Sequence, residues 1–222
     1  PCGEESPAGV SAQHAAGDAI GTSADNFNSE EVIYINNDAI YPYTEGMTSA
    51  ELIVYYHGIE TGKNIKKRQN TILGVLKEKK DKLSGKIFLI PAGHDKSYSS
   101  IHDTLSKLKS EKGVDTDAAQ PKLGFWSGGA VGGKTALDLE TFAKVEIADP
   151  SPQNNTIPSG TIRSSNINMV YDESNWGTSL YPWYPAAIKN YISKMSGSGA
   201  TIVEVANTHL DIMTGSIERL LK

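Results

Sequence analysis

The chain has 222 residues and a formal net charge of −5 at pH 7. This length suits one α/β domain with a sizeable core, and the negative charge leaves no basic footprint for nucleic acid. Cys2 is the single cysteine, so an internal disulfide framework is excluded, and no apolar run approaches the roughly 18 residues of a membrane span. We therefore expect neither nucleic acid nor a membrane among the partners.

Residues 1–30 are rich in alanine, glycine, serine and acidic residues and show little apolar periodicity. This composition is typical of an extended or loosely packed segment, because it offers little surface to bury. We therefore predict an N-terminal arm over 1–30, able to join a larger assembly, and a single domain over 31–222.

From Glu51 onward, apolar runs of strand length alternate with segments of helical periodicity. Ile65, Ile72 and Leu76, for example, recur with helical spacing. The expected strands are one or two within 31–43 and one each at 51–56, 86–90, 123–126, 144–148, 167–171 and 201–205; the expected helices are 63–82, 99–111, 129–143, 185–195 and 210–221. Strands separated by helices predict an α/β fold, with a mostly parallel, twisted sheet covered by helices on both faces.

The segment 122–135, KLGFWSGGAVGGKT, places a serine and glycines between a predicted strand and a predicted helix. This arrangement matches the nucleophile elbow, in which a serine on a strained turn is exposed between small residues. Ser127 followed by Gly129 fits that motif. Phe125 departs from it, because a small residue is expected two positions before the serine.

The same segment also matches a phosphate-binding loop. Gly128, Gly133, Lys134 and Thr135 satisfy the pattern G-x-x-x-x-G-K-[ST], whose backbone amides cradle phosphates at a helix N-terminus. Asp149 ends an apolar strand and would be the magnesium-binding partner. Against this alternative, such a loop normally follows the first strand of its domain, whereas at least two strand–helix units precede this one.

Ligands of open α/β sheets bind outside the carboxyl ends of the strands, so the residues that follow each predicted strand are candidates. His57-Gly58 follows the strand at 51–56, and Ser127 follows the strand at 123–126. Further candidates follow the three later strands: Asp149, then Asp172-Glu173, then His209.

Ser127 with Gly129, then Asp172, then His209, with His57-Gly58 upstream, resembles the α/β-hydrolase superfamily of serine esterases, lipases and peptidases. The resemblance covers about residues 50–222. It implies a three-layer α/β sandwich whose site lies at the carboxyl edge of the sheet.

The resemblance also implies roles. Ser127 would attack an acyl carbonyl, His209 would accept the serine proton and Asp172 would hold the imidazole, with Glu173 and Asp149 as alternative acids. The oxyanion hole would be formed by the backbone N–H of Gly128 and that of Gly58 or Ile59.

The segment 149–166 is short and polar, which predicts an open site without a large apolar cap. We expect a small-molecule or polymer-linked ester as the substrate, cleaved through an acyl-enzyme, with an ester favoured over an amide or peptide. Four aromatic residues are candidates for substrate binding, with packing of the loop as the alternative for those after Asp172: Trp126, Trp176, Tyr181 and Trp183.

No metal or cofactor is expected, because His94, Asp95 and His102 are poorly spaced for ligating a metal and no cluster of carboxylates supports them. Besides the phosphate loop, a hydrolase-like fold that only binds or scaffolds remains a third hypothesis. Labelling by a serine-directed probe distinguishes it from an enzyme.

Overall fold

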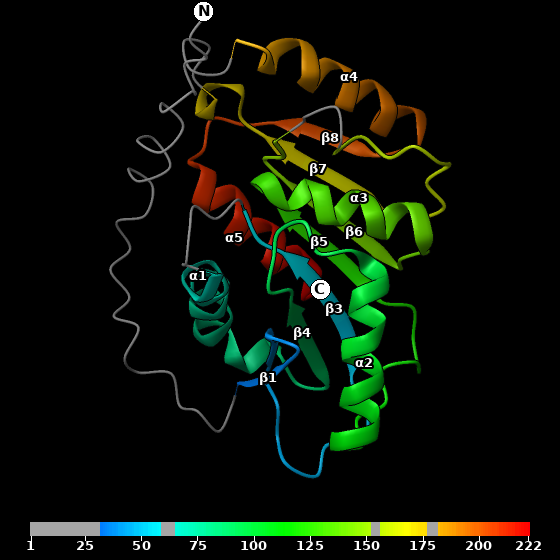
Figure 1. Ribbon diagram of the computed structural model, residues 1–222. Helices are drawn as coiled ribbons and strands as arrows, with labels where there is room; N and C mark the ends of the chain where they lie inside the picture. Colours follow the sequence, from blue (N-terminus) through cyan, green and yellow to red (C-terminus); the bar gives the residue numbers. More distant parts are fainter. Residues whose placement is uncertain (1–31, 59–64, 152–155, 177–181) are drawn as a thin grey trace, which may run out of the picture.

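The computed structural model of the chain describes residues 32–58, 65–151, 156–176 and 182–222 (Figure 1). The arm predicted over 1–30 lies outside the described residues. Within them, the strands form one eight-stranded sheet with the order β1-β2-β4-β3-β5-β6-β7-β8. The strands are β1 (Ile33–Ile35), β2 (Asp38–Tyr41), β3 (Glu51–Tyr56), β4 (Lys86–Ile90), β5 (Lys122–Trp126), β6 (Lys144–Ala148), β7 (Ile167–Tyr171) and β8 (Thr201–Glu204).

The pairing of the strands confirms a mostly parallel sheet. β2 pairs antiparallel with both β1 and β4, whereas every pair from β4 through β3 and β5 to β8 is parallel. Because parallel strands point the same way, the residues after β3, β5, β6, β7 and β8 emerge at one edge of the sheet. That edge is where the sequence predicted the site.

Helices cover both faces of the sheet and complete three layers (Figure 1). One face carries α2 (Tyr98–Lys112), α3 (Ala130–Leu139) and α4 (Tyr184–Gly197), and the other carries α1 (Ile65–Glu78) and α5 (His209–Leu220). The five predicted helices are present, with different ends. None of the described helices is long and apolar enough to cross a membrane.

The ends of α1, α2 and α3 differ from the sequence prediction in ways that local structure accounts for. The helix predicted over 63–82 ends as α1 at Glu78 and is followed by the 3-10 turn η1 (Lys80–Lys82). The helix predicted to begin at residue 99 begins as α2 at Tyr98, after the cap Ser97, whose side chain accepts a hydrogen bond from the Ser100 N–H. The helix predicted to reach residue 143 ends at Leu139, because the Phe142 N–H donates to Ser164 Oγ instead of continuing the helix.

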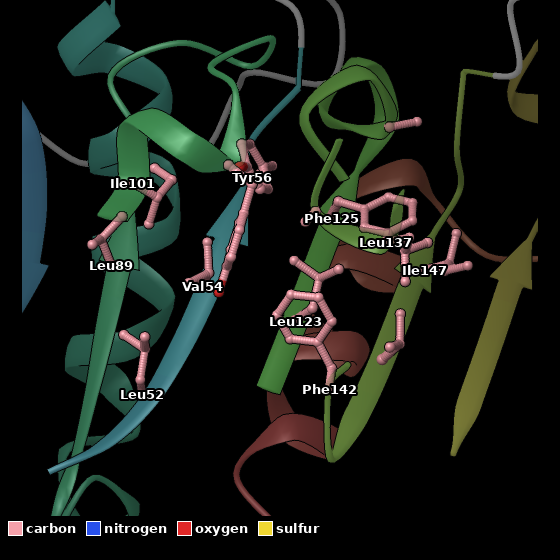
Figure 2. Close-up of a cluster of buried hydrophobic side chains, with 14 of the residues drawn as sticks. Leu52, Val54, Tyr56, Leu89, Ile101, Leu123, Phe125, Leu137, Phe142 and Ile147 are labelled. Atoms are coloured by element: carbon pink, nitrogen blue, oxygen red, sulfur yellow. The ribbon is translucent and has the colours of Figure 1, made fainter. Parts of the chain in front are cut away.

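Successive side chains of the strands alternate between the two faces and build two separate cores. Along β3, Leu52, Val54 and Tyr56 face α2 and α3, whereas Ile53 and Tyr55 face α1 and α5. Figure 2 shows the first of these cores, where strand side chains such as Leu123 and Phe125 pack with Leu137 of α3.

Two glycines allow α3 to lie unusually close to the sheet. A Cβ placed on Gly132 would lie 2.2 Å from the Tyr56 ring, and one on Gly133 would lie 2.3 Å from the Phe125 ring. Both distances are shorter than any van der Waals contact, and both rings are fully buried. The close packing of α3 against the sheet therefore depends on glycine at these two positions.

Gly132→Ala is expected to lower the free energy of unfolding by about 1–3 kcal/mol, since the methyl group overpacks the core against Tyr56. Gly74→Ala is the matched control within helix α1, because a Cβ at Gly74 meets nothing within 4 Å. It should raise the same free energy by roughly 0.5–1 kcal/mol, as alanine favours a helix more than glycine does. Urea denaturation of both variants measures the difference, and equal stability of the two would contradict this account of α3.

Candidate active site

Ser127 occupies a strained turn between β5 and α3. It begins the 3-10 turn η2 (Ser127–Gly129) with φ of 54°, a left-handed conformation that residues other than glycine seldom adopt. Such strain persists only where the surroundings enforce it, and it concentrates at functional sites. The strand, turn and helix predicted from the sequence are therefore all present at the serine.

The surroundings of this turn explain its neighbouring residues. A Cβ on Gly129 would lie 2.6 Å from the carbonyl oxygens of both Tyr56 and His57, so only glycine fits two positions after the serine. Phe125, where a small residue was expected, is accommodated from the other side. Gly133 of α3 leaves room for its ring, so the close approach of helix and strand is achieved by a glycine on the helix.

The segment that matches a phosphate loop does not form one. Residues 128–135 lie in η2 and α3, and the glycines of α3 pack against aromatic rings. Lys134 forms an ion pair with Asp138 at 2.8 Å, one turn along the helix. The Thr135 hydroxyl donates to the Gly132 carbonyl at 2.7 Å. The groups that would bind phosphate and magnesium are thus engaged within the fold.

His209 is the first residue of α5 and pairs with Asp149. Its Nδ1 forms a hydrogen bond with Asp149 Oδ2, and the Asp149 side chain is fully buried after the end of β6. The other ring nitrogen, Nε2, is buried and has no hydrogen-bond partner among the described residues. One side of the imidazole is therefore held by a carboxylate while the other remains available for a proton.

Ser127 and this pair lie at the same edge of the sheet. β5 and β6 are neighbours, with Trp126 paired in register with Ala148, so Ser127 and Asp149 each follow at adjacent strand ends. The Trp126 ring lies 4.7 Å from the His209 ring, centroid to centroid. The Ser151 N–H also donates to the Ser127 carbonyl at 3.0 Å, which joins the segment after Asp149 to the serine turn.

The partner of His209 is not Asp172, the acid that the sequence analysis put first. The Asp172 carboxylate accepts hydrogen bonds from the Ser174 N–H at 2.8 Å, the Ser174 hydroxyl at 2.6 Å and the Asn207 N–H at 2.9 Å. It therefore caps the 3-10 turn η4 (Glu173–Asn175) and lies one strand further from β5 than Asp149. Glu173, the other alternative acid, is exposed.

Further donors surround the Asp149 carboxylate. Its Oδ1 accepts from the Asp172 N–H and from Trp176 Nε1, each at 3.2 Å. Its Oδ2 accepts from Asn175 Nδ2 at 2.9 Å in addition to His209. Both oxygens of this buried carboxylate therefore have hydrogen-bond donors. The sequence analysis missed Asn175, which carries no motif or periodic signal.

The loop after β3 reaches the serine, as expected for half of an oxyanion hole. A Cβ on Gly58 would lie 3.2 Å from Ser127 Cβ, so the Gly58 backbone is immediately beside the nucleophile candidate. Gly128 follows the serine in η2, whereas Ile59 lies outside the described residues. The buried His57 ring places Nδ1 2.8 Å from the Gly58 carbonyl and Nε2 3.0 Å from that of Pro91, which ties the loops after β3 and β4 together.

The aromatic candidates separate into two groups. Trp126 and Trp176 are buried against His209, the second at 5.6 Å and edge to face. They therefore hold the imidazole and line no open surface. Trp183 is 38% exposed, and Tyr181 lies outside the described residues.

Tyr184 completes the packing behind Trp176. The two rings stack with centroids 5.0 Å apart and an interplanar angle of 11°. Burial raises the pKa of the Tyr184 phenol, and the charge of Asp149 raises it further. The phenol is therefore neutral at neutral pH.

Among the described residues, no group of three or more His, Cys, Asp or Glu side chains is arranged to hold a metal ion. His102, considered from the sequence, instead lies 3.5 Å from Glu140 on the surface.

Solved structures share this architecture. A lidless α/β serine hydrolase from Xanthomonas campestris has a TM-score of 0.52 and 13% identity, over 83% of this chain and 87% of that one. The siderophore hydrolase EstA from Aspergillus nidulans has a TM-score of 0.52 and 12% identity, over 83% and 89%. A ferulic acid esterase has a TM-score of 0.51 and 10% identity, over 86% and 94%.

No family model matches the sequence, and no curated protein matches it either. The likeness to the solved structures establishes the fold, and with the strand order given above the chain has the α/β-hydrolase fold.

Proposed function

We propose that this chain is a serine hydrolase that cleaves a carboxylic ester, with Ser127 as nucleophile, His209 as base and Asp149 as acid. The observation that carries the proposal is the buried Asp149–His209 pair, whose Nε2 has no partner among the described residues, at the sheet edge that also holds the strained Ser127. Nucleophile, base and orienting acid together are what an acyl transfer at neutral pH requires.

The proposed reaction proceeds in two halves. Ser127 Oγ attacks the ester carbonyl while His209 Nε2 accepts the serine proton, and the oxyanion of the tetrahedral intermediate is stabilised by backbone N–H groups of the serine turn and the Gly58 loop. The C–O bond to the leaving group then breaks, and His209 returns the proton to the departing alkoxide. Water, deprotonated by His209, releases the acid from the acyl-enzyme in the same way.

An open site favours a soluble or polymer-linked ester over a long acyl chain. Within the part of the 149–166 segment that the structure describes, no α-helix covers the edge of the sheet. Three of the structural neighbours are a lidless serine hydrolase, a siderophore hydrolase and a ferulic acid esterase. These names support an ester as the substrate of this chain and a carboxylesterase as its class.

A fluorophosphonate probe tests the proposal without knowledge of the natural substrate. We expect one probe to attach per chain, at Ser127, with the mass measured on the intact protein and the site by peptide mapping. Ser127→Ala and heat-denatured protein should remain unlabelled. If folded wild-type protein takes up no probe and hydrolyses no short-chain nitrophenyl ester, the chain is a binding or structural module with a hydrolase fold.

A further inference from the structure

We propose that the turn formed by residues 172–176 is a positioning element that fixes the proposed acid, Asp149, and the proposed base, His209, relative to each other. Asp172 and Asn175 are its main positioning residues. This inference rests on the function proposed above. It gives Asp172 a role that depends on its oxygen atoms as hydrogen-bond acceptors and not on its acting as the acid of the triad.

The turn lies at the end of the strand between those that lead to the acid and to the base. Asp149 follows β6 and His209 lies beyond β8, with β7 between those two strands. The 172–176 turn follows β7 and therefore emerges between the acid and the base. Neighbouring strands lie about 4.8 Å apart, so side chains of this turn reach both sides.

On the side of the acid, the turn supplies three donors to one carboxylate. The Asp172 N–H and Trp176 Nε1 donate to Asp149 Oδ1, and Asn175 Nδ2 donates to Asp149 Oδ2. Together with His209 these donors surround both oxygens. The plane of the Asp149 carboxylate, and with it the direction toward His209, is therefore determined by the 172–176 turn.

On the side of the base, the same turn holds the segment that leads to His209. Asp172 Oδ2 accepts from the Asn207 N–H at 2.9 Å, and Asn175 Nδ2 donates to the Asn207 carbonyl at 3.1 Å. The backbone N–H and the backbone carbonyl of Asn207, two positions before His209, are thereby both hydrogen-bonded. The Asn175 amide donates to both Asp149 and the Asn207 carbonyl, so it links the acid to the segment that leads to the base.

The base needs this support because its own segment has little packing. Residues 206–208 are exposed, and β8 is an edge strand that pairs with β7 alone among the described strands. Because this segment has no buried residue, its position depends on hydrogen bonds, namely those from the 172–176 turn and the Thr208 cap of α5. Since a misplacement of about 1 Å costs roughly 10²-fold in rate, these hydrogen bonds are expected to affect turnover.

The test compares kcat and KM for a short-chain nitrophenyl ester in wild-type protein and in Asp172→Ala and Asp172→Asn. Asp172→Ala should lower kcat about 10- to 100-fold and change KM little, because the base is displaced while the binding surface remains. Asp172→Asn should recover part of that loss, since the amide oxygen still accepts from the Asn207 N–H and its NH2 group donates to Ser174 Oγ, whereas the Ser174 N–H loses its acceptor. For a triad acid the asparagine variant would be as inactive as the alanine variant, because the imidazole takes the wrong tautomer.

Asn175→Ala is the second variant, and it should also lower kcat about 10-fold or more. Asn175 is exposed, so the fold should persist, which circular dichroism checks. Glu173→Gln, an exposed carboxylate in the same turn, is the matched control and should match the wild type.

Wild-type kcat in both Asp172→Ala and Asn175→Ala would overturn the positioning role, and so would an Asp172→Asn variant no more active than Asp172→Ala. With either result, fluorophosphonate labelling of the wild-type protein at Ser127 keeps Ser127 as the proposed nucleophile, and the acid is then decided by comparing Asp149→Asn with Asp172→Asn. Failure of that labelling would instead remove the proposed function.

Discussion

Replacing Ser127 or His209 by alanine is expected to remove nearly all ester hydrolysis, by roughly 10⁶-fold in kcat where the serine-protease precedent applies. Without Ser127 no acyl-enzyme forms, and without His209 the serine hydroxyl keeps its proton and is a poor nucleophile at neutral pH. The double variant should lose little more than either single variant, because the two groups act as a unit. Steady-state kcat values for a short-chain nitrophenyl ester, measured in the single and double variants, test this expectation.

Controls for these variants come from the surface of the same chain. His102→Ala and Ser110→Ala replace an exposed histidine and an exposed serine of helix α2, away from the carboxyl edge of the sheet. Both should retain the wild-type rate. Full activity of Ser127→Ala would show that the strained serine is not the nucleophile.

Asp149→Asn is expected to lower kcat by about 10⁴-fold, the effect of the same change in a Ser-His-Asp triad. The amide cannot stabilise the imidazolium, and its NH2 group favours the tautomer of His209 that carries no proton on Nδ1. The carboxylate is fully buried and bonded to His209, so no water substitutes for it.

The comparison that decides the identity of the acid is Asp149→Asn against Asp172→Asn, both measured at the same substrate concentrations. Asp138→Asn is a further control, because the Asp138 carboxylate pairs with Lys134 on helix α3 and bonds to neither Asp149 nor His209. An active Asp149→Asn variant alongside an inactive Asp172→Asn variant would restore the assignment that the sequence order first suggested.

The proposed site and its support follow from three consecutive parallel strands. β6 carries the acid, β7 carries the 172–176 turn and β8 leads to the base, so each strand end contributes one part. Ser127 lies on the other side of the acid, at the end of β5. The chemistry therefore depends on the order of strands in the sheet more than on any one motif.

Local sequence determined the elements of this fold. Alternating or continuous apolar runs such as 51–56 and 86–90 form strands, and the periodic segments between them form helices. The spacing of apolar residues along the chain sets which face of each element is apolar. The alternation of the two predicted a mostly parallel sheet, and the strand ends indicated Ser127, His209 and the Gly58 loop as one site. The elements and the sheet needed only periodicities of two and 3.6 residues, whereas the roles of the site residues came from the resemblance to the α/β-hydrolase superfamily.

Tertiary structure decided between alternatives that are identical in local sequence. The segment 122–135 satisfies two motifs, and it folds as a strand, a 3-10 turn and a helix in which Gly132 and Gly133 pack against the rings of Tyr56 and Phe125. Those rings lie on other elements of the fold. Asp149 and Asp172 each follow a parallel strand, and nothing in the residues around them ranks one above the other. Which carboxylate meets His209 depends on the strand from which the α5 loop is reached and on donors such as Asn175 and Asn207, and those contacts exist only once the sheet has formed.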